Sequence, residues 1–353
     1  MKKILLSLLV LISTIPFTNA TVLTVSNNPT GGAQYATILA AYTAASSGDT
    51  LLLEGTPTNY DAPHPWGKQL VVIGAGYNPN KANTQVTLLT SLPISFFELG
   101  ASGNNSKFYG IVFSQSFQTA NAISNYYFEN CKFTGAVNFH SPGNAINGLI
   151  MKNCIFMDNA HSPTQLSSNL LFVSCIFNGY LYGAGNQLGS SGWVTIDHCL
   201  FLSGNTNLFD LFNAQITNSI FMNSTNITGS GGGNNVFYNN IYSAASATIP
   251  TSQSGFPNNG LNNHPSTDPN FVLYPLNFQY SKLHNYHLNT GSPAIGAATN
   301  GGDIGPHGSN TNFSETGEVL ITPLIQIMNI NNSIVAPGGT LNVQLNVRKP
   351  TDY

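Results

Sequence analysis

The sequence predicts an all-β solenoid in which each repeat forms one coil of a parallel β-helix. The first observation is a hexapeptide, "FENCKF" at 128–133, that recurs five times, with its last aromatic at positions 156, 177, 201, 221 and 242. These ladder aromatics are separated by 20 to 24 residues, a period typical of solenoids. The second observation is a strand-like alternation in each copy, as in Cys131-x-Phe133. The third is that helical periodicity and the leucine-rich-repeat pattern are both missing.

The composition excludes several function classes. Only 7% of the 353 residues are charged, against about 25% in an average soluble domain, and the net charge is −3. Arg348 is the single arginine, so the basic stripe that nucleic-acid binding needs is missing. Hydrophobic residues make up 42% of the chain, which argues against disorder. We expect a folded protein with a nearly neutral surface of amides and hydroxyls, and no nucleic-acid partner.

The N-terminus has the features of an export signal. Residues 1–20, "MKKILLSLLVLISTIPFTNA", combine two lysines, an apolar run from Ile4 to Ile12 and a small residue at Ala20. We expect a signal peptide that is cleaved near Ala20, and a mature protein that is secreted or associated with the cell surface. No later apolar stretch reaches the roughly 18 residues of a membrane helix, so no membrane span is predicted in the mature protein.

Residues 21–318 are predicted to form the β-helix domain, with an N-terminal helical cap at about 21–55. The capping segment reads strand, turn, short helix, turn and strand. The alanine-rich "ATILAAYTAA" has its larger apolar residues on one face, and "SSGDT" is a turn signal. A cap is expected because the exposed edge strands of a solenoid invite aggregation.

One residue per repeat is expected to bend the chain between two short strands. The position before the cysteine or its equivalent holds Asn130, Asn153, Ser174, His198, Asn218 and Asn239. Asparagine and histidine are among the few residues that tolerate the left-handed backbone conformation. We therefore expect a sharp bend at each of these positions, and hydrogen bonds between stacked asparagines along the helix axis.

This pattern resembles the right-handed parallel β-helix, or pectate-lyase-like, superfamily, whose tight turn often carries an asparagine ladder. The resemblance spans most of residues 22–318. It includes "DPNF" at 268–271, "YHLNTGSPAIGAA" at 286–298 and "GGDIGPHG" at 301–308, which look like the closing coils of secreted bacterial β-helix proteins. The resemblance implies the fold. It leaves both binding and catalysis open, because proteins of this fold have many different activities and some have no catalytic activity.

The four cysteines are predicted to stack in one inward row, with about 4.8 Å between coils. They are Cys131, Cys154, Cys175 and Cys199. Buried free thiols behave as small hydrophobic groups; disulfides between adjacent coils are the alternative, because export favours oxidation. The paired cysteine spacing of zinc sites and the His-x-His spacing are both missing, so we predict no metal site and no cofactor.

Few residues offer catalytic chemistry. The outward column four positions before the ladder aromatics is Glu129, Lys152, Val173, Asp197, Thr217 and Tyr238. Glu129 and Asp197 are three coils apart, about 14 Å at the standard strand spacing, whereas a glycosidase pair lies about 5–9.5 Å apart. Glu129 and Lys152 are adjacent, and we expect them to form an exposed ion pair.

The weak catalytic candidates are Asp197, His198 and Lys152. A carboxylate beside an imidazole can act as an acid–base pair. Successive strand residues face opposite ways, however, so we expect His198 to serve the bend. The resemblance implies that lyases of this fold use a basic residue beside an acidic calcium cluster; no grouped aspartates are present in the solenoid, and calcium would be needed only if the protein is a lyase.

A second outward column is apolar. The position before each ladder aromatic holds an aliphatic residue in five coils, and this set is called the aliphatic column below: Ile155, Ile176, Leu200, Ile220 and Ile241. An exposed strip of this kind usually means contact with something. Either a loop or the strands after residue 318 cover it, or it docks a protein partner or a polysaccharide.

Aromatic residues in predicted loops favour sugar binding, because aromatic rings present an apolar face together with a polar edge. Tyr180, Tyr182 and Trp193 lie in the glycine-rich segment "NGYLYGAGNQLGSSGW" at 178–193, and Tyr60 and Trp66 lie in an earlier predicted loop. We predict Tyr180, Tyr182 and Trp193 as ligand-binding residues.

Residues 319–353 are predicted to form a short C-terminal β-rich tail of two or three strands. For the whole chain the sequence favours a secreted or surface-associated β-helix protein that is non-catalytic and binds a polysaccharide or a surface partner. The alternative is a polysaccharide lyase or glycoside hydrolase that acts on an extracellular polysaccharide.

Overall fold

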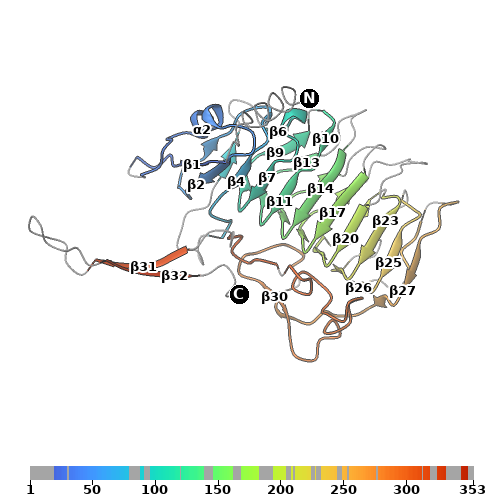
Figure 1. Cartoon of the computed structure of the whole chain (residues 1–353). Helices are drawn as coiled ribbons and strands as arrows, with labels where there is room; N and C mark the ends of the chain where they lie inside the picture. The colour runs from blue at the N-terminus through green and yellow to red at the C-terminus, as the bar shows by residue number, and fades with distance from the viewer. Residues whose placement is uncertain are drawn as a thin grey trace, which may run out of the picture.

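The structure is a computed structural model of the whole chain (Figure 1). It describes residues 20–29, 32–78, 88–90, 96–119, 121–138, 146–161, 168–182, 194–203, 208–209, 211–223, 227, 232–244, 249–252, 254–275, 277–311, 313–318, 324–330 and 343–348. The predicted signal peptide, apart from Ala20, lies outside these residues. Among the described residues, no helix is both long and apolar enough to cross a membrane.

The described strands stack into three long parallel sheets, and most coils contribute one strand to each sheet, so the chain forms a parallel β-helix (Figure 1). This confirms the predicted fold class. The twelve-stranded sheet contains β1 (Val22–Val25), β2 (Thr50–Leu53), β4 (Val71–Ile73), β7 (Lys107–Tyr109), β10 (Ile123–Ser124), β11 (Tyr127–Glu129), β14 (Ile146–Lys152), β17 (Ser168–Val173), β20 (Val194–Asp197), β23 (Ala214–Thr217), β25 (Val236–Tyr238) and β27 (Asn259–Leu261).

The other two long sheets are built from shorter strands. The ten-stranded sheet contains β3 (Tyr60–Asp61), β5 (Leu88–Thr90), β8 (Val112–Phe113), β12 (Lys132–Phe133), β15 (Ile155–Phe156), β18 (Ile176–Phe177), β21 (Leu200–Phe201), β24 (Ile220–Phe221), β26 (Ile241–Tyr242) and β28 (His264–Pro265). The six-stranded sheet contains β6 (Phe96–Leu99), β9 (Ser116–Thr119), β13 (Val137–Asn138), β16 (Ala160–His161), β19 (Leu181–Tyr182) and β22 (Leu208–Phe209).

The remaining elements lie before, between and after these sheets. Helix α2 (Ile38–Ala44) follows β1, and its buried Ile38 and Ala41 join the hydrophobic core of the solenoid. The short 3₁₀ helix η1 (Ala101–Gly103) follows β6. Strands β29 (Phe271–Leu273) and β30 (Asn285–Leu288) pair antiparallel after the last coil. In the tail, β31 (Leu324–Ile330) and β32 (Val343–Arg348) also pair antiparallel.

The ladder aromatics stack on one another from coil to coil. Parallel register places the ladder aromatics opposite one another from Phe133 through Tyr242. Between Phe156 and Phe221 the stacked ring centroids are 4.7 Å apart and the rings are nearly parallel. That distance matches the spacing of neighbouring strands, about 4.8 Å, so one ring per coil fills the interior without a gap. The rings are fully buried.

The bend residue of each repeat has the left-handed conformation that the sequence predicts. The six predicted positions, from Asn130 to Asn239, have φ between +52° and +55°. Most of their side chains, however, do not form the predicted ladder along the axis. The residue at a bend points away from the interior, and the next residue points into it. The hydrogen-bonded stack therefore forms one position later, where Ser219 N and Asn240 N donate to the side chains of Asn240 and Asn263.

The four cysteines occupy the predicted inward row. All four are free thiols and fully buried, so the structure favours packing over the disulfide alternative. Each thiol donates to a backbone carbonyl of the preceding coil, as Cys175 Sγ does to Met151 O at 3.4 Å. Burial raises the pKa of Cys154 and of Cys199, which keeps these thiols protonated and unreactive.

The aliphatic column faces outward from the coils as predicted, but it is not a free docking surface. All five of its side chains are fully buried. The chain turns back after the last coil, and the described residues of 268–318, called the cover below, lie along the outer face of the ten-stranded sheet (Figure 1). Cover residues that pack on the column are Phe271, Tyr286, Ala294, Ala298, Ile304 and Phe313. The prediction that the aliphatic column docks a protein partner is therefore corrected. The column is occupied by the cover, a segment of the same chain that precedes residue 319.

Several bend residues hold this cover in place. Asn130 Nδ2 donates to Glu318 O at 2.8 Å, and Asn239 Nδ2 donates to Ala297 O at 2.7 Å. Between them, Ser174 Oγ lies 2.5 Å from Ser309 Oγ. These amide and hydroxyl groups therefore find their partners in the cover, whereas the amide oxygens of Asn130 and Asn153 are buried without a hydrogen-bond partner among the described residues.

Replacing Ile176 with alanine tests the cover. Ile176→Ala removes a fully buried side chain between the sheet and the cover, so we expect a loss of about 2–5 kcal/mol in the free energy of unfolding. Urea denaturation followed by circular dichroism measures the loss. The matched control is Leu283→Ala, because Leu283 lies in the cover and is 72% exposed. Equal stability of the wild type and Ile176→Ala would show that the column is open.

Candidate functional site

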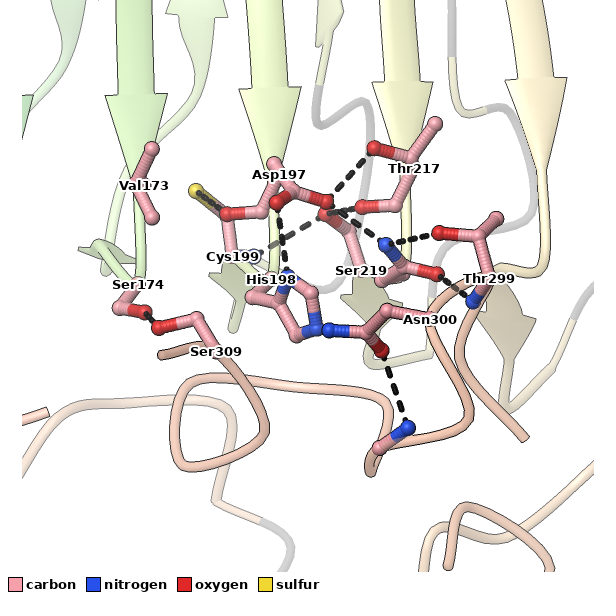
Figure 2. Close-up of polar contacts among 12 residues, drawn as sticks. Val173, Ser174, Asp197, His198, Cys199, Thr217, Ser219, Thr299, Asn300 and Ser309 are labelled. Carbon is pink, nitrogen blue, oxygen red and sulfur yellow. Dashed lines mark hydrogen bonds and ion pairs between the residues drawn. The ribbon is translucent and has the colours of Figure 1, made fainter. Parts of the chain in front are cut away.

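The first candidate from the sequence, the Asp197–His198 pair, is assembled at a bend beneath the cover (Figure 2). His198 Nδ1 lies 2.8 Å from Asp197 Oδ2, although the two residues are neighbours in the chain at the end of a strand. The left-handed backbone of His198, with φ +52°, turns its ring back beside the carboxylate. The prediction that the two side chains face opposite ways is therefore wrong at this position.

A network of hydrogen bonds joins this pair to the cover (Figure 2). Asp197 Oδ1 accepts from Thr217 Oγ1 at 2.6 Å and from Asn218 Nδ2 at 2.8 Å. Asn218 Oδ1 in turn accepts from Thr299 N in the cover at 2.8 Å. The side chain of His198 is only 3% exposed, so a substrate cannot reach this imidazole. The network instead has a structural role, because it anchors the cover at Thr299 against the bends of two coils.

The electrostatics of Asp197 agree with that role. Burial alone would raise the pKa of Asp197, but the hydrogen bond and charge of His198, with the hydrogen bonds of Thr217 and Asn218, outweigh it. The pKa of Asp197 is therefore held below its ordinary value of 3.8. The carboxylate stays ionised at neutral pH, as an anchor should.

The second candidate is the outward face of the twelve-stranded sheet, called the open face below. Figure 1 shows this sheet across the front of the molecule and the cover along its lower edge. The register confirms the predicted outward column, in which Glu129 pairs with Lys152 and Asp197 pairs with Val173 and Thr217. In the coils that hold Tyr109, Tyr127 and Lys152, these outward side chains are half-buried, and the cover does not bury them fully.

Four side chains on the open face form one cluster, called the tyrosine cluster below: Tyr109, Tyr127, Glu129 and Lys152. The Tyr127 hydroxyl donates to Glu129 Oε2 at 2.6 Å. Lys152 Nζ lies 5.6 Å from the centre of the Tyr127 ring, in a cation–π contact. Tyr109 and Tyr127 have ring centroids 5.6 Å apart, tilted by 45°.

This arrangement differs from the exposed ion pair predicted for Glu129 and Lys152. Among the described contacts, both charged groups engage Tyr127, the carboxylate at its hydroxyl and the ammonium at its ring face. Burial, followed by the hydrogen bond to Glu129, raises the pKa of Tyr127. Burial also raises the pKa of Tyr109. Both phenols are therefore protonated hydrogen-bond donors at physiological pH.

The cluster holds one carboxylate, which limits its chemistry. The next acidic residue along the same column is Asp197, three coils on, about 14 Å away at the standard strand spacing. Asp197 is also engaged by His198, Thr217 and Asn218. Two carboxylates at glycosidase separation are not found along this column in the described residues. The tyrosine cluster can therefore bind a ligand through its two tyrosine rings, the carboxylate of Glu129 and the ammonium group of Lys152.

The predicted aromatic binding residues have mixed outcomes. Tyr180 is half-buried in a turn, where its backbone N–H donates to Asn159 Oδ1. Tyr182 lies on β19 with His161 as its register partner, and Trp193 lies outside the described residues.

The prediction that Tyr60 and Trp66 lie in a loop that favours sugar binding is wrong, because both side chains are buried in the core. The Tyr60 hydroxyl donates to Glu54 O, and the Trp66 indole N–H donates to Ser106 Oγ. The residues around each of them are typical of loops, so the sequence does not indicate that the two side chains lie inside the solenoid.

Tyr109 and Tyr127 were missed from the sequence, although a signal for them exists. "FYGIVF" at 108–113 is a further copy of the hexapeptide, with glycine at the bend and isoleucine in the cysteine position. Gly110 has φ +64°, so it takes the same left-handed role as the asparagines. Adding this coil to the column places Tyr109 directly beside Glu129.

Comparisons with known proteins give little functional information. No family model matches the chain, and no curated protein sequence is significantly similar to it. Among solved structures, the crystal structure of pectate lyase Pel9A is similar to this chain, with 15% sequence identity and a TM-score of 0.48. The match covers 83% of this chain and 97% of that chain. This likeness transfers neither residues nor activity, and the parallel β-helix stands on its own strand order.

Replacing Asp197 with asparagine tests the anchoring network. Because the pKa of Asp197 is lowered on folding, its charged form stabilises the fold above a pH of about 4, and this contribution is lost as the pH falls through the folded pKa. We expect Asp197→Asn to lose about 1–2 kcal/mol at neutral pH and the difference from wild type to shrink below a pH of about 4. Chemical denaturation from about pH 7 down to about pH 3 measures both.

The control for this prediction is Asp158→Asn. Asp158 is exposed and accepts a hydrogen bond from its neighbour, Asn159. A pH-independent difference between Asp197→Asn and wild type would contradict the charged anchor.

Proposed function

We propose that the protein is exported and binds an extracellular polysaccharide along the open face of its twelve-stranded sheet, without cleaving it. The observation that carries the proposal is the tyrosine cluster. Two half-buried tyrosine rings lie 5.6 Å apart on adjacent coils, beside a carboxylate and an ammonium group. Rings of this kind offer apolar contact area at low entropic cost, and their hydroxyls and charged neighbours offer hydrogen bonds to sugar hydroxyls.

The surroundings of the cluster favour a long, weakly charged ligand. The face continues through half-buried Ile150, Leu171 and Val173 on the next coils. Only 7% of the chain is charged, so a strongly charged polymer would find few partners. A polymer lying along the helix axis could contact several coils at once, which adds affinity through repeated weak contacts.

Catalysis is the alternative, and one observation favours it. On the six-stranded sheet, Glu98 Oε2 lies 3.2 Å from His64 Nε2, and Gln118 Nε2 donates to Glu98 Oε1 at 2.9 Å. A carboxylate–imidazole pair can transfer protons. The side chains of His64 and Glu98 are 23% and 14% exposed, and the amide of Gln118 already engages the carboxylate, so this group is better explained as a packed carboxylate–imidazole contact with a structural role.

Replacing Tyr127 with alanine tests the binding surface. Loss of the ring removes the partner of Tyr109, Glu129 and Lys152 together, so we expect binding to weaken about tenfold or more. Affinity electrophoresis and equilibrium binding to a panel of neutral and acidic polysaccharides measure the change. Tyr127→Phe keeps the ring and should retain most of the affinity.

The matched control is Tyr238→Ala. Tyr238 lies in the same outward column, is 37% exposed and is five coils beyond Glu129. Equal weakening by Tyr127→Ala and Tyr238→Ala would refute the cluster as the site. Mass spectrometry of the incubated polymers adds a separate readout: unsaturated or newly hydrolysed ends, lost in Glu98→Gln, would replace binding by catalysis.

A further inference from the structure

Three metal-ligating side chains converge on the cover, outside the open face. They are His287, His307 and Glu315, and their donor atoms all lie within 4.8 Å of one another. His287 Nδ1 is 3.4 Å from Glu315 Oε1. The two imidazole rings stack with centroids 3.8 Å apart and a tilt of 22°. The spacing of these residues in the sequence, 20 and 8 positions, matches no short metal motif, which is why the sequence predicts no metal site.

Each of the three donor residues lies in a different segment of the cover, and the fold positions each one separately. On β30, Tyr286 is buried against the aliphatic column, so the alternation of the strand turns His287 away from the core, where its side chain is 53% exposed. Asn285 Oδ1 lies 2.8 Å from His287 Nδ1. The same nitrogen faces Glu315, so an ion at this site would bind Nδ1 in place of the contact with Asn285.

His307 belongs to a turn that is pinned to the solenoid. Gly305 N donates to Asn218 O at 2.9 Å, and Gly305 has φ +105°. A side chain at this position would meet Ile220 Cδ1 at 2.6 Å, so only glycine allows the turn to approach the aliphatic column this closely. The ring of His307 is further positioned by Phe313, whose ring meets it edge-on at 5.7 Å.

Glu315 is held from the other side of the site. Tyr77 N donates to Thr316 O at 3.0 Å, and Asn78 Nδ2 donates to Glu315 O at 3.1 Å. The backbone around the carboxylate is therefore tied to the segment that follows β4. Three side chains from separate segments meet on rigid supports, the arrangement expected of a preorganised site.

The donor set selects the kind of ion. Zinc bonds of about 2.0–2.2 Å in a tetrahedron place neighbouring ligand atoms about 3.4 Å apart, the distance already found between His287 and Glu315. All three donor atoms lie within 4.8 Å of one another, and binding one ion would require the stacked imidazole rings to rotate toward it. Two imidazoles and one carboxylate suit zinc and other late first-row ions, whereas calcium and magnesium prefer oxygen ligands throughout.

We propose that the cover binds a divalent first-row ion, Zn²⁺ in the simplest case, through His287, His307 and Glu315. The ion links β30, the turn that follows Gly305 and the segment 313–318, and so locks the cover over the aliphatic column. This site is separate from the tyrosine cluster, and its existence does not depend on polysaccharide binding. Because the unfolded chain lacks the assembled site, bound zinc should also raise the temperature of unfolding.

Zinc titration of the folded protein tests the proposal. Protein purified with a tag that contains no histidine is freed of metal with a chelator and titrated with zinc chloride by calorimetry. We expect one ion per chain, and a rise in the unfolding temperature that is reversed by the chelator. His307→Ala and Glu315→Gln should each weaken zinc binding about tenfold or more, in line with the loss of a ligand.

The control variant is His284→Ala. His284 lies three residues before His287, but its ring packs against Tyr274 and Tyr286 instead of the donor cluster. It should bind zinc as the wild type does, even if its unfolding temperature falls. Absence of zinc binding below about 100 µM, or the same affinity in His307→Ala as in wild type, would overturn the proposal; zinc retained by a His287→Ala/His307→Ala double variant would assign the ion to other ligands.

Discussion

The left-handed bend, one residue in each coil, is the constraint on which the rest of this structure depends. A residue with φ of about +52° turns the chain between the twelve-stranded and ten-stranded sheets within a single position. The next residue must then point inward, the one after it outward and the third inward again. This order stacks the thiols, the aliphatic column and the aromatic rings in register, coil after coil. Asparagine, serine, histidine and glycine can take the bend position, and each does so here.

The same bend gives the solenoid two outer faces with different roles. The ten-stranded face carries the aliphatic column, which cannot remain in water without cost, and the cover buries it. The outward side chains of the bends supply the hydrogen bonds that hold the cover at Asn130, Ser174, Asn218 and Asn239. The twelve-stranded face, just before the bend, carries the tyrosine cluster and stays half-exposed. Packing thereby separates the closed face from the face available to a ligand.

Most of the solenoid could be predicted from the sequence because its contacts are periodic. The register of the columns that begin with Phe133 and Glu129 follows from the repeat length alone. The partner of the aliphatic column could not be predicted in the same way, because Phe271 and Ile304 lie outside the repeat and no period relates them to Ile176. The coil at 108–113 was also hidden, because Ile111 fills the position that cysteine marks in other copies.

The candidate sites also divide into features that the sequence could predict and features that depend on contacts between distant segments. Asp197 and His198 were found from the sequence, but their role required knowledge of Thr299 in the cover. The donors His287, His307 and Glu315 are distant in the chain and meet only because the cover folds back on itself. Short-range patterns detect ligands that share one strand or helix, and these three share none. Long-range convergence of this kind becomes visible only in three dimensions.

Hydroxyl-radical footprinting with mass spectrometry can show whether the cover closes one face of the solenoid and leaves the other open. We expect strong oxidation of Leu283 and Leu261, which are 72% and 63% exposed, intermediate oxidation of Tyr127, and none at Ile176 and Ile220 in the folded protein. Oxidation of Ile176 and Ile220 at the level of Leu261 would refute this division of faces, because the aliphatic column would then be the free surface.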